Sequence, residues 1–298
     1  MSATGKPRSL IAGIVELLRP PNVFTAVADS LAGLALAHAG LLAVSARGFW
    51  LVPASASLYL GGMALNDYFD REVDARERPE RPIPAGVVPA AVACLLGAGL
   101  LAAGLWFAWI AGGRALLVAV PLAAAIVLYD GVLKGSAVGF LNMGACRGLN
   151  LSMPLAIAPR ALPTIACLAP LFLTAYISVL TYLSRDEVGG NTLARARRGV
   201  AMMAGVGAMM AASLAVVRSS LLGWIFLLLA IARAVSLFGP LRESPSGAAT
   251  GRAIGGGILL IPLFDATFVA AEGDLASAVA VAALALPALA LRRLYSPT

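Results

Sequence analysis

The sequence is poor in charge, in histidine and in cysteine, and each shortage excludes a class of protein. Only 12% of its 298 residues are Asp, Glu, Lys or Arg, whereas 60% are hydrophobic. Soluble domains have about a quarter of their residues charged, so a chain of this composition could not cover its apolar surface in water. The single histidine, His38, lies in an apolar segment, where a packed or capping residue is a simpler interpretation than a metal ligand.

The cysteines and the net charge exclude two further classes. Cys94, Cys146 and Cys167 all lie in apolar runs and lack the spacing of metal ligands, so they predict neither a zinc site nor a disulfide framework. The net charge of +7 would suit a nucleic-acid-binding protein. The basic residues flank apolar segments, however, and form no separate stripe, so we expect no nucleic-acid partner.

Long apolar runs are what the sequence has in abundance. They recur in lengths of about 20 residues, enough for a helix to span the roughly 30 Å of hydrocarbon in a bilayer. A helix satisfies its own backbone hydrogen bonds in lipid. We therefore predict an all-α fold, a polytopic transmembrane bundle of nine to ten helices that forms a single integral membrane domain over residues 1–298. The expected spans are residues 23–43, 49–69, 87–110, 115–133, 137–158, 162–183, 199–217, 220–239, 252–271 and 274–291.

The basic residues alternate between the connecting segments and so predict a topology. Most of the 22 Lys and Arg residues fall before the first run or after the second, fourth, sixth, eighth and tenth runs. The opposite connections hold only Arg47, Arg114, Arg160 and Arg218. By the positive-inside rule, the N-terminus and the charged loops at 66–86 and 182–198 face the cytoplasm. We expect a bacterial inner-membrane protein with an active site that opens inward.

Acidic residues concentrate in NDYFDREVDARERPERPIPAG, residues 66–86. Asn66, Asp70 and Asp74 follow one another at intervals of four, which predicts one amide and two carboxylates on one side of a helix, with Asp67 on another face. Like charges one turn apart repel at the end of a membrane span, and a divalent cation removes that repulsion. Oxygen ligands suit Mg²⁺. The alternative is a solvated helix end with local pairs to arginine.

The spacing Asn66-x-x-x-Asp70-x-x-x-Asp74, followed by RPERPIPAG, resembles the first signature of the UbiA family of intramembrane prenyltransferases. The resemblance implies a helical bundle that uses Mg²⁺ to transfer a prenyl group from an isoprenyl diphosphate to a lipophilic acceptor within the membrane. It implies that Asp70 and Asp74 are catalytic residues and that, together with Asn66, they are metal ligands. It also implies that Arg78 and Arg81 bind the diphosphate.

Two later stretches extend the resemblance. YDGVLK carries Tyr129 and Lys134, which are similar to a tyrosine and a lysine that the family places near the diphosphate; a lysine that snorkels to the membrane surface is the alternative. Arg147 and Asn150 are polar residues within the next run. They either line a polar cavity that binds the diphosphate or pair with a carboxylate across the bundle. Asp29, in the first run, is either a site residue or a helix-pairing group.

YLSRDEVGG, from Tyr182 to Gly190, stands where the family carries its second aspartate motif. Asp186 matches the first aspartate and is a catalytic and metal-binding candidate, with Glu187 beside it as a further metal ligand. Tyr182 and Arg185 would contact the diphosphate. Gly190 occupies the position of the second aspartate, which implies a weaker second metal site or a loss of the ordinary activity. The SRDEVGG form is similar to a divergent bacterial subgroup of the family, the EboC-like members.

Two other functions compete with a prenyltransferase. A CDP-alcohol phosphotransferase is also intramembrane and Mg²⁺-dependent, but that family's Asp-Gly…Ala-Arg…Gly…Asp…Asp pattern on consecutive turns is absent from this sequence. A non-catalytic or transport-associated membrane protein that keeps the UbiA fold is the other alternative, since the second aspartate motif is incomplete. Metal-dependent binding of a diphosphate separates these alternatives. The sequence leaves the identity of the acceptor open.

Overall fold

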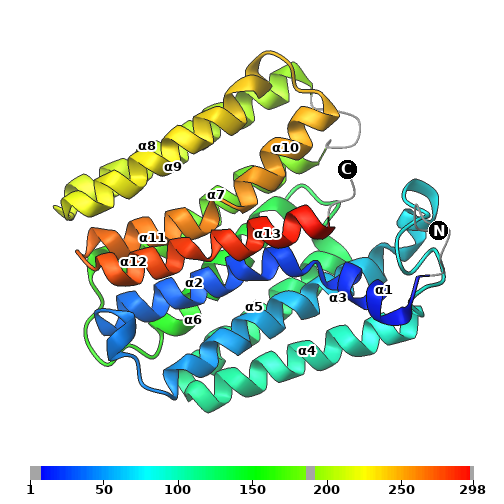
Figure 1. The fold of residues 1–298 in the computed structure, drawn as a ribbon, viewed down its shortest axis with the longest axis horizontal. Coiled ribbons are helices and arrows are strands. Elements are labelled where there is room, and N and C mark those ends of the chain that lie inside the picture. Colours follow the sequence, from blue (N-terminus) through cyan, green and yellow to red (C-terminus); the bar gives the residue numbers. More distant parts are fainter. Residues whose placement is uncertain (1–7, 186–191, 296–298) are drawn as a thin grey trace.

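The computed structural model describes residues 8–185 and 192–295, with side chains as far as Arg292, and all regular elements in those ranges are helices (Figure 1). This agrees with the all-α prediction. The α-helices are α1 (Leu10–Leu18), α2 (Pro20–His38), α3 (Leu51–Glu77), α4 (Ala90–Ala111), α5 (Gly113–Leu128), α6 (Gly139–Leu155), α7 (Thr164–Ser184), α8 (Leu193–Val216), α9 (Leu221–Phe238), α10 (Gly247–Ile258), α11 (Ile261–Ala271), α12 (Leu275–Ala283) and α13 (Ala285–Tyr295).

Within the described part of the chain, eight helical segments are long and apolar enough to cross a membrane, and α1 with α2 would make a ninth. The pairs α10–α11 and α12–α13 each count as one such segment. Helix α6, with 17 residues, is shorter than these segments and packs inside the bundle against α2, α5 and α7. Helix α1 begins and α13 ends at the end of the bundle where α3 ends and α4 begins (Figure 1).

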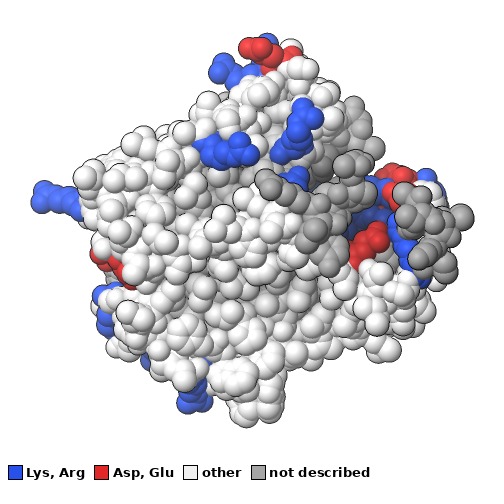
Figure 2. All heavy atoms as spheres, viewed as in Figure 1, with Lys and Arg blue, Asp and Glu red and all other residues white. Residues whose placement is uncertain are grey.

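The outer surface of the bundle is apolar. Leu95, Leu117 and Val216 are 73%, 76% and 78% exposed. Figure 2 shows a face that is largely without charge, with Lys and Arg side chains gathered toward its margins. A soluble protein rarely exposes apolar patches this large, whereas a surface in contact with lipid tails has this character.

Helices α1 and α2 meet at a bend of 42°. Arg19 lies at the junction with a φ of 48°, in the left-handed region, and Pro20 then begins α2 without a backbone N–H to donate. The bend directs the Arg19 guanidinium toward α3, where it donates to Oδ1 of Asp67 at 2.5 Å. Helix α2 therefore begins three residues before the predicted first span. It ends at His38 because Ala39 is also left-handed.

The two charged segments that we expected to be loops are partly helical. Helix α3 continues through Glu77, so the Asn66–Asp74 part of the first segment is helical and the turn follows it. In the second segment α7 continues to Ser184 and α8 starts at Leu193. Residues 186–191, which carry Asp186, Glu187 and Gly190, lie outside the described residues.

Small residues allow α6 and α7 to approach closely. A Cβ on Gly144 would clash with the backbone oxygen of Thr174 and with Oγ of Ser178, and a Cβ on Gly148 would clash with Oγ1 of Thr174. Helices in lipid gain stability mainly from such close backbone packing, because burying apolar surface against lipid tails yields little. The contact matters for the site because α6 and α7 both contribute to its wall.

Aromatic side chains join α7 to α10 and α11. The rings of Tyr176 and Phe264 lie 4.8 Å apart in a T-shaped arrangement, and Phe172 packs beside both. The buried hydroxyl of Tyr176 donates to the backbone oxygen of Gly257 at 2.8 Å. This bond satisfies a polar group that would otherwise be costly to bury, and it anchors α10 against the centre of the bundle.

The close approach of α6 and α7 predicts a specific stability defect. Gly144→Ala should lower the free energy of unfolding by about 1–3 kcal/mol, because the added methyl group pushes against the backbone of α7. Unfolding of the purified protein in detergent, followed by circular dichroism, measures this change. Gly99→Ala on α4 is the matched control, since a Cβ there meets nothing within 4 Å. Equal stability of the two variants would contradict the packing argument.

Candidate active site

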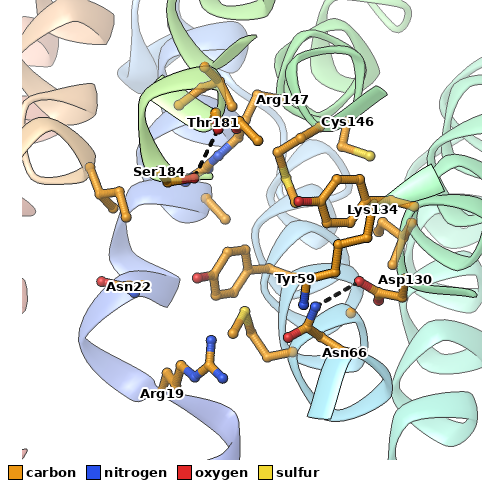
Figure 3. Close-up of a pocket in the computed structure, with 18 of the residues that line it drawn as sticks. Arg19, Asn22, Tyr59, Asn66, Asp130, Lys134, Cys146, Arg147, Thr181 and Ser184 are labelled. Atoms are coloured by element: carbon orange, nitrogen blue, oxygen red, sulfur yellow. Dashed lines mark hydrogen bonds between the residues drawn. The ribbon is translucent and has the colours of Figure 1, made fainter. Parts of the chain in front are cut away.

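A cavity of about 410 Å³ lies between the N-terminal and C-terminal halves of the bundle (Figure 3). Its volume falls in the range of roughly 300–1,000 Å³ that is usual for small-molecule sites. Side chains from α2, α3, α5, α6, α7, α10 and α11 line it. The apolar part of the wall includes Leu58, Leu122, Ile126, Ile177 and Leu180. The cavity thus combines an apolar wall with the polar groups described next.

Two cross-helix pairs form one polar side of the cavity. Asn66 and Asp70, four residues apart on α3, face Asp130 and Lys134, four residues apart beyond α5. Nδ2 of Asn66 donates to Oδ1 of Asp130 at 3.1 Å, and Nζ of Lys134 bonds to Oδ2 of Asp70. A π-helical turn from Tyr129 to Leu133 ends α5 and brings its Asp and Lys toward the cavity (Figure 3). Asn66 and Asp70 of α3 are therefore matched by groups from the turn that follows α5.

The other acids of α3 face a different set of partners. Asp67 and Asp74 are buried, with 4% and 5% exposure, and both bond to Nη1 of Arg81, at 3.4 Å and 2.7 Å. A helix turns about 100° per residue, so side chains seven apart differ by only about 20°, whereas Asn66 and Asp74 differ by about 80°. This rotation explains why Asp74 separates from the Asn66–Asp70 pair and joins Asp67.

A second polar cluster lies deeper in the bundle. Nη1 of Arg147 donates to Oδ2 of Asp29 at 2.7 Å, and Nδ2 of Asn150 donates to the same oxygen at 2.9 Å. Arg147 also bonds to Oγ1 of Thr25. Arg147 and Asn150 both line the cavity as well. The two alternatives that the sequence left open, a cavity wall and a pair with a carboxylate, are therefore both present. Asp265 of α11 is fully buried and interacts with Asp29.

Most of the residues that the sequence singled out line this one cavity. They are Asn66, Asp70, Arg78, Arg81, Tyr129, Lys134, Arg147 and Asn150. Asp74, Tyr182 and Arg185 do not line it. Arg185 bonds to the backbone oxygen of Ser136 and lies 5.5 Å above the ring of Phe140, while Tyr182 packs edge to face on the same ring. Asp186 and Glu187 lie outside the described residues. The binding roles of all these residues stay predictions.

Sequence reasoning missed two acids of the site. Asp130 lines the cavity. Its spacing of four residues from Lys134 could have identified it, because that spacing puts both side chains on one side of a helical turn. Asp67 holds Arg19 and Arg81 at the end of the cavity. Its signal was the seven-residue spacing to Asp74, which places both acids on the same helix face.

The donors at the Asn66–Asp70 end fit a magnesium ion. In the part of the chain that the structure describes, no three Asp, Glu, His or Cys side chains converge as a complete metal site. Mg²⁺ needs no such cage, because it keeps several waters and is usually held by one or two carboxylates together with substrate phosphates. Asp70, the amide oxygen of Asn66 and a buried oxygen of Asp130 supply hard oxygen donors of the required kind.

Comparison with known sequences places this arrangement in a family. The profile of the UbiA prenyltransferase family matches residues 26–243. The chain belongs to this family. Its membership and its apolar helices make it an integral membrane protein.

The curated relatives that the chain resembles include two enzymes of one name. The digeranylgeranylglyceryl phosphate synthase of Methanothrix thermoacetophila is 29% identical over 175 residues, which cover 57% of this chain and 60% of that protein. The enzyme of the same name from Methanopyrus kandleri is 30% identical over 168 residues, covering 56% and 59%. The match thus spans about three-fifths of the length of each relative.

Solved structures share the fold of this UbiA family member. A UbiA homologue from Aeropyrum pernix K1 superposes with a TM-score of 0.68 at 15% identity, covering 82% of this chain and 96% of that one. A UbiA homologue from Archaeoglobus fulgidus bound to GPP and Mg²⁺ gives a TM-score of 0.60 at 15% identity, covering 84% and 99%. The fold is therefore that of the family, as the sequence predicted.

The deep cluster predicts an energetic coupling between Arg147 and Asp29. Asp29→Asn and Arg147→Met should each destabilise the protein, because each leaves a buried partner unmatched. The double variant should be more stable than the sum of the two losses predicts, with a coupling of about 1–3 kcal/mol. Reversible unfolding in detergent of all four proteins measures this coupling. Additive effects would show that the pair contributes nothing to the fold.

Proposed function

We propose that this UbiA family member transfers a prenyl group from an isoprenyl diphosphate to a lipophilic acceptor within the membrane, with Mg²⁺ as cofactor. The observation that carries the proposal is the single cavity that joins Asp70, Asn66 and Lys134 to an apolar wall. A diphosphate needs cations and hydrogen-bond donors, whereas its prenyl tail needs a dry apolar surface. The cavity offers both within one enclosed volume.

The basic residues at the polar end would bind the diphosphate. Lys134, Arg78 and Arg81 all line the cavity, and Arg19 joins them from the α1–α2 bend. The ion pairs to Asp67 and Asp74 hold Arg19 and Arg81 in place before the substrate arrives. Preformed charge of this kind stabilises a leaving group without reorganisation during the reaction.

Asp70 and Asn66 would hold the metal ion. The Mg²⁺ ion would act as a Lewis acid that neutralises the departing diphosphate and as a template for its orientation. Lys134, which is bonded to Asp70 and lines the cavity, would supply an ammonium group to the diphosphate. The apolar wall would keep water from the allylic cation, so that the acceptor attacks it first. No described residue stands out as the base that takes the proton from the acceptor.

The named relatives guide the choice of acceptor. They are digeranylgeranylglyceryl phosphate synthases, so an acceptor with a glyceryl phosphate group is the first to test, beside aromatic and quinone precursors. The distribution of basic residues supports a cytoplasmic N-terminus and a cytoplasmic polar end of the cavity. We retain the bacterial inner membrane as the expected location.

One observation favours a second function. Gly190 replaces an aspartate of the second family motif, so a member that binds diphosphate without turnover, or serves a transport-associated role, is the alternative. A single assay separates the two. Full-length protein in lipid nanodiscs would receive Mg²⁺, radiolabelled geranyl, farnesyl or geranylgeranyl diphosphate and each acceptor class. Prenylated product supports the enzyme, whereas binding without product supports the alternative. Failure to bind any diphosphate would refute the enzyme and favour the transport-associated role.

Asp70 offers a direct test of the metal site. Asp70→Ala should abolish the Mg²⁺-dependent binding of isoprenyl diphosphate, because it removes the carboxylate that faces both the cavity and Lys134. The metal-free stability should change by no more than about 1 kcal/mol, since the lost ion pair is partly exposed. Isothermal titration calorimetry with and without Mg²⁺ measures the binding.

Glu72→Ala is the matched control for Asp70→Ala. Glu72 lies on the same helix, but its side chain is 78% exposed and pairs only with the neighbouring Arg71. The Glu72→Ala variant should bind isoprenyl diphosphate with the same Mg²⁺-dependent affinity as the unaltered protein. If Asp70→Ala retains full Mg²⁺-dependent affinity, Asp70 does not hold the metal.

A further inference from the structure

Asp130 is a buried acid with one oxygen that has no partner. Its side chain is 9% exposed, and Oδ1 accepts the hydrogen bond from Nδ2 of Asn66. Oδ2 is buried and has no hydrogen-bond partner in the part of the chain that the structure describes. A buried polar atom without a partner costs about 1–3 kcal/mol, so such an atom in a folded protein requires an explanation.

No cation of the described residues satisfies this carboxylate. Lys134 is the nearest candidate on the same turn, yet its ammonium group bonds to Asp70. Arg81 and Arg19 are taken by Asp67 and Asp74. The ion pairs of the described residues therefore do not include Asp130.

Asp130 belongs to the wall of the cavity. The residue lines the cavity beside Asn66 and Asp70, and the π-helical turn at the end of α5 places it there (Figure 3). The Asn66 amide gives its nitrogen to Asp130, so its oxygen is available to a ligand. Asp130, Asn66 and Asp70 thus lie together in the wall of the cavity.

We propose that Oδ2 of Asp130 is a ligand of the divalent cation that this cavity binds with the diphosphate, together with Asp70 and the amide oxygen of Asn66. The proposal rests on the proposed function. An added carboxylate strengthens the hold on the ion by charge as well as by ligand number. Asp130 would in this way supply from α5 the negative charge that the second motif lacks at Gly190.

The competing explanation is that Asp130 only orients Asn66, and two substitutions separate the explanations. Asp130→Asn keeps an oxygen that can accept the Asn66 hydrogen bond but removes the charge. Asp130→Ala removes both. A direct ligand predicts that both variants lose metal affinity, whereas an orienting residue predicts that only Asp130→Ala does.

Metal affinity is measured on the full chain in lipid nanodiscs, by electron paramagnetic resonance of Mn²⁺ with inorganic pyrophosphate present. We expect Asp130→Asn to weaken Mn²⁺ binding by roughly 10-fold or more, the size of effect seen when the surroundings of a metal site are disturbed. Glu72→Gln, which removes an exposed charge from α3, should stay within about twofold of the unaltered protein, because surface charges are screened. Unchanged affinity in Asp130→Asn would overturn the proposal.

The Asp130→Cys variant tests metal ligation by a gain of affinity and not by a loss alone. It also provides a test if Asp130→Asn does not fold. Asp130→Cys should bind Mn²⁺ weakly but gain affinity for Cd²⁺, because a thiolate is a soft ligand. Cys146 lines the same cavity, so the variant is made together with Cys146→Ser, and Cys146→Ser alone is the control. No gain in Cd²⁺ affinity over that control would overturn the proposal.

The outcomes distinguish this proposal from the proposed function. If the unaltered protein binds neither pyrophosphate nor Mn²⁺ in a coupled manner, the proposed function fails and this inference fails with it. If the unaltered protein binds Mn²⁺ together with pyrophosphate, and Asp130→Asn binds Mn²⁺ with the same affinity, only the inference fails. A metal-free melting curve for each variant verifies that it is folded.

Discussion

Charged side chains inside a membrane protein need partners, because neither lipid tails nor a dry interior solvates them, and this requirement shapes the whole bundle. Asp29 binds Arg147, Asp67 and Asp74 share Arg81, and Asp70 binds Lys134. The Asp29–Arg147 and Asp70–Lys134 pairs join elements that are distant in sequence, whereas Arg81 lies in the turn that follows α3. The same contacts that neutralise charge therefore hold the helices around one cavity.

The acids of α3 divide into two groups by the rotation of the helix. Asn66 and Asp70 face α5 and the cavity, whereas Asp67 and Asp74 face Arg19 and Arg81. One group is open to a ligand and the other is occupied. The occupied pair keeps the arginines at the polar end of the cavity, so the division of acids within one helix sets both the metal donors and the basic groups near them.

The cavity depends on both halves of the chain. Helices α2, α3, α5 and α6 supply its polar groups, while α7, α10 and α11 supply much of its apolar wall. Close contact at Gly144 joins α6 to α7 across these halves, and the hydrogen bond from Tyr176 to Gly257 joins α7 to α10 within the second half. A break in α5, the π-helical turn, is what carries Asp130 and Lys134 to the metal donors of α3. Irregular helix geometry thus lies where the chemistry is expected.

The sequence by itself determined the membrane class, the helical fold and many of the polar residues of the cavity. Composition and run length decide the first two, because hydrocarbon leaves helices as the natural solution for such runs. The spacing of Asn66 and Asp70 indicated the polar end of the cavity. Only the tertiary structure decided the partners of each charge. Asp74 turns from the cavity to Arg81, Arg147 meets Asp29 from 118 positions away, and Asp130 faces Asn66. Pairing across helices depends on how the helices rotate and pack, and spacing along one helix contains no record of it.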